Sequence, residues 1–92
     1  MQQETAQVLA LQALEWLAAD DEVFATFLAA TGASAGNLTG RAQDEDFLAA
    51  ILDFLLTNDD WVIAFCDQRG LTYASPMAAR AVLAGGQLEN WT

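Results

Sequence analysis

The chain has 92 residues, with thirteen acidic side chains against three arginines and no histidine, so its formal charge is −10 at pH 7. Yet 54% of the residues are hydrophobic, whereas disordered chains combine high charge with low hydrophobicity. This composition predicts one folded domain. It argues against direct binding of nucleic acid or of an anionic membrane surface, since both require clustered basic residues.

The sequence also shows no signal for secretion or membrane insertion. Its first residues lack the basic segment and long apolar run of a signal peptide. The apolar stretch 47–56 is interrupted by Asp53, and Cys66 has no second cysteine to pair with. We therefore expect a soluble cytoplasmic protein.

The first half of the chain is predicted to form two helices and a short third one. The first starts at Thr5 and runs to about Ala19. Asp20 caps the second, which stops at Gly32, because glycine readily adopts the left-handed conformation that ends a helix. The short third helix covers 34–38, with Ser34 as its cap.

The second half repeats these signals. Asp44 caps a helix over 45–57, and Asn58 caps a fifth helix that ends at Gly70. No alternating strand pattern occurs anywhere, so the prediction is an all-α bundle of five or six short helices.

The last helix is predicted to start with Ser75 as the cap and Pro76 at the first helical position, and to end at the glycine pair 85–86. We therefore expect a single helical domain over 1–86, with 1–4 frayed, followed by a C-terminal tail over 87–92.

The distribution of apolar residues distinguishes the helices. The 45–57 helix is apolar nearly all round, which predicts that it is the central helix, buried by its neighbours. The first helix has one broad apolar side and one polar side. Val8 and Leu11 fall on the polar side, where water is normally found.

An internal repeat of about 38 residues is consistent with this organisation. Shifting the chain by 38 positions superimposes caps, glycine stops and core aromatics, pairing Asp20 with Asn58, Phe27 with Phe65, and Gly32 with Gly70. The pattern indicates two pseudo-repeats around the central helix. Any bundle with acidic caps and glycine stops would give a similar pattern, so the alternative is no repeat at all.

Many of the carboxylates gather in three clusters, at 20–22, 44–46 and 58–60. None has the alternating oxygens, the sixth-position glycine and the twelfth-position glutamate of a calcium-binding EF-hand loop. All three stand at predicted helix starts, where carboxylates cap free N–H groups. We therefore predict capping, with no metal and no cofactor.

Catalytic chemistry has little support. The chain has no histidine or lysine to move protons or form a Schiff base, and Cys66 is predicted to be a small buried hydrophobe. Glu15 and Asp53 occupy equivalent repeat positions and would make an acid–base pair if they met, but solvated surface is the better interpretation. No catalytic residue is predicted.

Binding through the surface is the remaining possibility. Val8 and Leu11 are candidate contacts for a partner or a second copy of the chain; the alternative is that other parts of the same chain cover them. Leu88 and Trp91 of the tail form a second apolar candidate, which either folds back on its own domain or docks in a partner groove.

Three segments carry a resemblance to a known family: Trp-Leu-Ala-Ala-Asp at 16–20, Phe-Leu-Ala-Ala-Thr-Gly at 27–32, and Asp-Phe-Leu-Ala-Ala-Ile-Leu-Asp-Phe-Leu-Leu at 46–56. They resemble domain-of-unknown-function family 3572, a family of small bacterial proteins. The resemblance covers roughly 5–85. It implies a compact helical domain in a bacterial cytoplasm and carries over no functional residue.

The leading hypothesis is a non-enzymatic interaction or regulatory module that binds a protein partner, or itself as a homodimer, through an apolar patch. The first alternative is an acidic decoy for a basic protein partner. The second is a small-molecule or enzymatic role in a pocket between helices.

Overall fold

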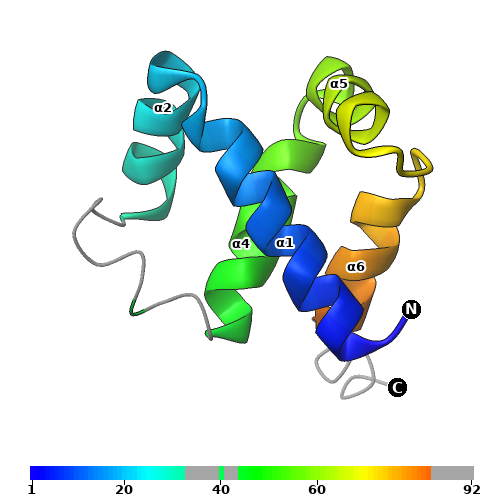
Figure 1. The fold of residues 1–92 in the computed structure, drawn as a ribbon. Coiled ribbons are helices and arrows are strands. Elements are labelled where there is room, and N and C mark those ends of the chain that lie inside the picture. The colour runs from blue at the N-terminus through cyan, green and yellow to red at the C-terminus, as the bar shows by residue number, and fades with distance from the viewer. Residues whose placement is uncertain (33–39, 41–43, 84–92) are drawn as a thin grey trace.

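The computed structural model describes residues 1–32, 40 and 44–83. Within these ranges all regular structure is α-helical, which confirms the predicted fold class. The helices are α1 (Gln3–Ala18), α2 (Asp21–Thr31), α4 (Glu45–Leu56), α5 (Asp59–Arg69) and α6 (Ser75–Leu83) (Figure 1). The predicted short helix over 34–38 and the predicted tail over 87–92 lie outside the described residues.

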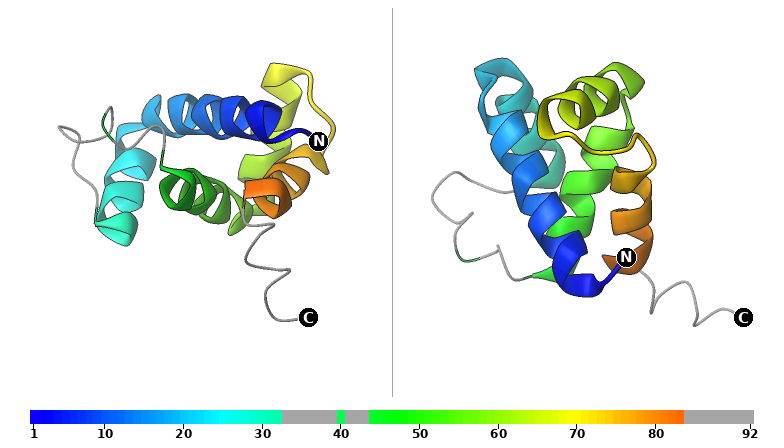
Figure 2. Two further views of the ribbon diagram at one scale, coloured as in Figure 1. Left: turned by 90° about the horizontal axis from the view of Figure 1, so that it is seen from below. Right: turned by 45° about the vertical axis from the view of Figure 1, so that its right-hand side comes forward.

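Helix α4 is the centre of the bundle, as its nearly continuous apolar surface predicts. It packs against all four of the other described helices. Helix α1 crosses α4, and α6 packs against both of them. Helices α2 and α5 lie on opposite sides of the α1–α4 pair, near the C-terminal end of α1 (Figures 1 and 2).

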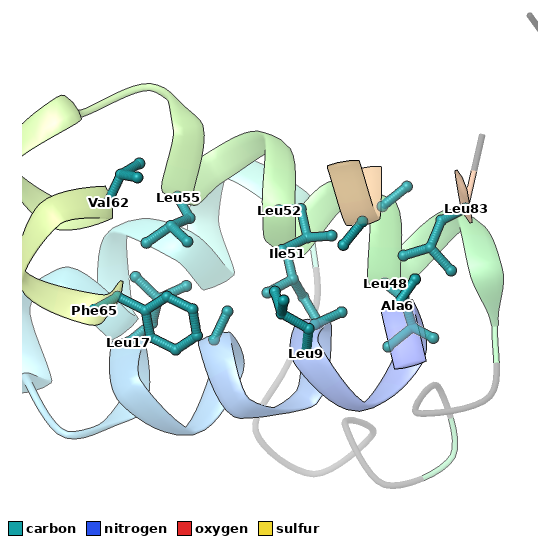
Figure 3. Close-up of a cluster of buried hydrophobic side chains, with 14 of the residues drawn as sticks. Ala6, Leu9, Leu17, Leu48, Ile51, Leu52, Leu55, Val62, Phe65 and Leu83 are labelled. Atoms are coloured by element: carbon teal, nitrogen blue, oxygen red, sulfur yellow. The ribbon is translucent and has the colours of Figure 1, made fainter. Parts of the chain in front are cut away.

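The core runs along the interface of α1 and α4. At one end Leu17 of α1 lies beside Phe65 of α5, and at the other Ala6 lies near Leu83 of α6 (Figure 3). All four side chains are buried, and for Ala6 and Leu17 this confirms the predicted apolar face of the first helix. Burying a side chain of leucine or phenylalanine size stabilises the fold by roughly 1.5–3 kcal/mol.

Helix α2 is attached to this core mainly through one aromatic side chain, with partly buried apolar residues of the same helix packed beside it. Phe27 is the only buried residue of α2. Its ring lies 5.4 Å from the ring of Phe54 and 6.0 Å from that of Phe47, both on α4. The remaining faces of α2 are therefore less tightly packed than those of α4.

The predicted caps of α2 and α5 are confirmed. The Asp20 side chain accepts hydrogen bonds from two backbone N–H groups of α2, at 3.0 and 3.2 Å. The Asn58 side chain does the same for α5, at 2.9 and 3.4 Å. The two helices end at Gly32 and Gly70, whose φ angles of 73° and 67° are left-handed. Helices α2 and α5 thus have the same caps, stops and length at the predicted 38-residue offset.

Two helix starts differ from the prediction. Helix α1 begins at Gln3, ahead of the predicted Thr5, and receives no side-chain cap from Gln2. Helix α6 begins at Ser75 itself, so Ser75 is not its cap. The Ser75 hydroxyl instead forms a hydrogen bond with the Thr72 hydroxyl at 2.8 Å, which orders the turn before the helix.

Candidate functional site

A cleft of about 330 Å³ lies where the end of α1 and the start of α2 face α5. Its lining is mostly apolar and consists of Trp16, Leu17, Ala19, Asp20, Val23, Trp61, Ala64 and Gln68. We call it the tryptophan cleft. Its volume is at the small end of the range for ligand pockets, which suits one or two side chains rather than a large cofactor.

Core aromatics hold both tryptophans of the cleft. The Trp16 ring lies edge-on to Phe65, with centroids 6.2 Å apart. The Trp61 ring is tilted by 32° against Phe54 at 5.3 Å. Because the supporting rings belong to packed helices, the two indoles are positioned before any partner arrives. Such pre-positioning lowers the entropy cost of binding.

The cleft continues along the first turn of α2. A second cavity, of about 400 Å³, shares Asp20, Val23 and Trp61 with it and adds Glu22 and Thr26 of α2. The caps place these residues, since Asp20 fixes the first turn of α2 and Asn58 fixes the turn that carries Trp61. Together the two cavities form a groove with carboxylates along one edge.

Both arginines among the described residues are held in ion pairs. Arg69 of α5 donates a hydrogen bond to Glu15 at 2.9 Å, and Arg80 of α6 donates one to Asp53 at 2.6 Å. Neither arginine lines the tryptophan cleft or its continuation. The carboxylates of the groove therefore have no basic side chain opposite them within the described ranges.

The predicted contacts on α1 are exposed to solvent. Val8 is 51% exposed and Leu11 is 37% exposed, so the described residues leave both available to a partner. They belong to the side of α1 opposite its buried residues, and neither lines the tryptophan cleft. The other two predicted contacts, Leu88 and Trp91, lie outside the described residues.

Cys66 is buried, as predicted. Its thiol donates a hydrogen bond to the Thr72 carbonyl oxygen, with a sulfur–oxygen distance of 3.4 Å. Burial, together with the nearby Asp67 carboxylate, raises the pKa of the Cys66 thiol, so the thiolate is disfavoured. Arg69, one turn away, is paired with Glu15.

The first residue of each predicted cluster caps the helix that follows it. Asp44 accepts hydrogen bonds from the N–H groups of Asp46 and Phe47 at 2.9 and 3.4 Å, as Asp20 does for α2. Among the described residues, no three metal-ligating side chains gather closely enough to hold an ion. Glu15 and Asp53 each pair with an arginine on another helix. No described helix is long and apolar enough to cross a bilayer.

The tryptophan cleft was not predicted as a site. The repeat offset contains one signal for it, because it pairs Val23 with Trp61, and both residues line the cleft. The contribution of Trp16 depends on how α1 lies against α5, which no local pattern specifies.

Comparison with known proteins places the whole described bundle in one family. A family model, described as protein of unknown function (DUF3572), matches residues 3–86. No curated protein and no solved structure matched the chain. The matched segment contains α1 to α6 and every residue that lines the tryptophan cleft. The chain therefore belongs to the DUF3572 family, as its helical packing segments predict.

Proposed function

We propose that this protein is a non-enzymatic interaction module that binds a segment of a partner protein in the tryptophan cleft. The observation that carries the proposal is the pair of fixed indoles, Trp16 and Trp61, lining one partly open cleft. Tryptophan is among the residues most enriched at the energetic centres of protein interfaces. An apolar side chain of the partner fills the cleft between them.

The chemistry of the described residues supports binding rather than catalysis. The one thiol is buried with a raised pKa, and the chain contains no histidine. Nucleophilic catalysis with cysteine needs an accessible thiolate and a nearby base or positive charge. A catalytic or small-molecule role in the same cleft is the less favoured alternative.

The outer face of α1 is a second candidate contact. Val8 and Leu11 lie one turn apart and are both exposed, which favours a small apolar contact with a partner or a second copy. This face has only two large apolar side chains, whereas the tryptophan cleft is concave and mostly apolar. A solution mass measurement tests self-association: replacing both residues with serine removes any dimer that uses this face.

Site-specific crosslinking in cells separates the two surfaces. The photoreactive residue p-benzoylphenylalanine is placed at Gln68, which lies on the rim of the cleft, and in a second protein at Val8. We expect a discrete crosslinked protein from position 68 that disappears when Trp61→Ala is added. A discrete crosslink from position 8 alone contradicts binding in the cleft and favours the face of α1.

Ionic strength tests the remaining alternative, that the protein is an acidic decoy. Contacts made only by carboxylates weaken steeply as salt screens them, whereas an apolar anchor in the cleft persists. We therefore expect the crosslink from position 68, repeated in a cell extract, to be reduced but retained in high salt. Its complete loss there favours a purely electrostatic decoy.

A further inference from the structure

The charge and aromatic character of the tryptophan cleft narrow the chemistry of the partner. We infer that the cleft binds a cationic amphipathic segment of another protein, in which an arginine or lysine lies beside a large apolar residue. This inference rests on the proposed function and adds the chemistry of the partner to the location of the contact.

Carboxylates border the cleft at the start of α2. Asp20 and Glu22 lie in its lining and in its continuation along α2. Asp21 belongs to the same turn of α2, and Asp59 and Asp60 form the first turn of α5, directly before Trp61. The described arginines are paired with other carboxylates, so neither of them neutralises the carboxylates beside the cleft. A cation supplied by a partner is therefore attracted by their negative potential.

The aromatic lining favours the same ligand. Indole is the side chain that attracts cations most strongly, and arginine is the cation most often found over it. The Trp61 ring packs against Phe54 at a tilt of 32°, and Trp61 lines both cavities. A guanidinium near the indoles is therefore attracted both by the aromatic rings and by the carboxylates of the rim. An adjacent apolar side chain occupies the mostly apolar interior of the cleft.

The same charges disfavour other occupants. An acidic or neutral apolar segment would gain nothing from the rim, and an acidic one would be repelled by it. A second copy of this chain also carries a formal charge of −10, so it is a poor occupant. The occupant is therefore expected to be a different protein with a basic segment.

Three synthetic helical peptides test the inference. The first combines leucine and arginine on one face; the second replaces its arginines with glutamate, and the third replaces its leucines with serine. Binding is followed by the indole N–H signals of ¹⁵N-labelled full-length protein carrying Trp91→Phe, so that only Trp16 and Trp61 report. We expect the leucine–arginine peptide to shift both indole signals and to bind about tenfold more tightly than the glutamate peptide or the serine peptide.

A charge variant tests the rim without disturbing the fold. Asp20→Asn combined with Glu22→Gln removes two charges, and asparagine caps a helix as well as aspartate does. We expect this pair to weaken the leucine–arginine peptide by about fivefold at low salt. The matched control, Glu4→Gln with Glu45→Gln, removes the same charge from the first turns of α1 and α4. It should change affinity by less than about twofold.

The contradicting results are distinct. If neither indole signal moves with the leucine–arginine peptide, the inference is wrong. If the glutamate peptide binds as tightly as the leucine–arginine peptide, the cleft is a contact but has no preference for a cation. If both charge variants weaken the leucine–arginine peptide equally, the charge effect comes from the net charge of the protein alone. The proposed function fails in a different experiment, through a crosslink at Val8 and none at Gln68.

Discussion

Arg69 of α5 donates a hydrogen bond to Glu15 of α1 at 2.9 Å, joining two residues that are 54 positions apart in the chain. Glu15 directly precedes Trp16, and Arg69 directly follows Gln68 on the rim of the cleft. The ion pair therefore connects the two helices that carry the opposing tryptophans. It contributes to the position of α5 relative to α1, in addition to the buried contacts of Leu17 and Phe65.

Arg69→Gln should cause only a small loss of stability. The Glu15 side chain is 75% exposed, and exposed ion pairs typically contribute about 0.2–1 kcal/mol. Urea unfolding at low salt should show a free energy of unfolding that is lower by an amount in that range. The difference from the unmodified protein should shrink as salt is added. A loss above about 2 kcal/mol, unaffected by salt, would show that Arg69 has a packing role beyond the ion pair.

Leu52→Ala should strongly destabilise the protein. Leu52 is fully buried on α4, and removing a buried leucine side chain costs about 2–5 kcal/mol through lost burial and the remaining cavity. Leu11→Ala is the matched control, because the same atoms are removed from an exposed site, with an expected effect within about 0.5 kcal/mol. Equal losses in chemical denaturation would mean that α4 is not the centre of the core.

Gly70→Ala should cost about 1–2 kcal/mol, because Gly70 has a φ angle of 67° and an L-residue is strained in that conformation. A Cβ at this position meets no atom within 4 Å, so the loss is conformational rather than steric. Gly32→Ala should give a similar loss, since it ends the equivalent helix with nearly the same angle. Melting temperatures of both variants measure this, and a stabilised Gly70→Ala protein would contradict the left-handed cap.

Stability should decrease in alkaline solution. Burial raises the pKa of the Cys66 thiol, and donation of the Tyr73 hydroxyl to Asp67 at 2.8 Å raises the pKa of Tyr73. The folded protein therefore retains protons that the unfolded chain releases. The stabilisation of the folded state by these two groups is complete below the ordinary pKa of each group. It is lost as the pH rises through the raised pKa values of the folded protein.

Unfolding free energies measured from neutral pH to about pH 11.5, beyond the ordinary pKa values of cysteine and tyrosine, test the alkaline effect. Cys66→Ala removes the thiol, and Tyr73→Phe removes the hydroxyl, so each variant should show a smaller decline than the unmodified protein. The double variant should show the smallest decline. A decline of the same size in all four proteins would assign the effect to other groups.

The sequence predicts the helices of this fold better than it predicts the cleft. Caps and stops are local chemistry, so Asp20, Asn58 and the two left-handed glycines define α2 and α5 at the predicted positions. The predicted start of α6 was wrong. The Ser75 hydroxyl forms a hydrogen bond with the Thr72 hydroxyl, and this contact competes with capping of the helix.

The cleft depends on how helices meet in space. Trp16 and Trp61 are each partly buried aromatics on an amphipathic helix, and such residues usually belong to a core. Helices α2 and α5 lie on opposite sides of the α1–α4 pair (Figure 1), and residues of both helices line the cleft. The exposure of Val8 and Leu11 was predictable, since it follows from the periodicity of one helix.

The most direct test of binding in the tryptophan cleft uses the partner protein that the crosslink at position 68 identifies. Its affinity, as a purified protein, is measured by calorimetry for two variants of this protein. We expect Trp61→Ala to weaken binding by at least about tenfold, while Val8→Ser combined with Leu11→Ser changes it by less than about twofold. Circular dichroism checks that both variants keep the helical fold. A partner that binds the Trp61→Ala protein as tightly as the unmodified one would contradict the tryptophan cleft as the site of interaction.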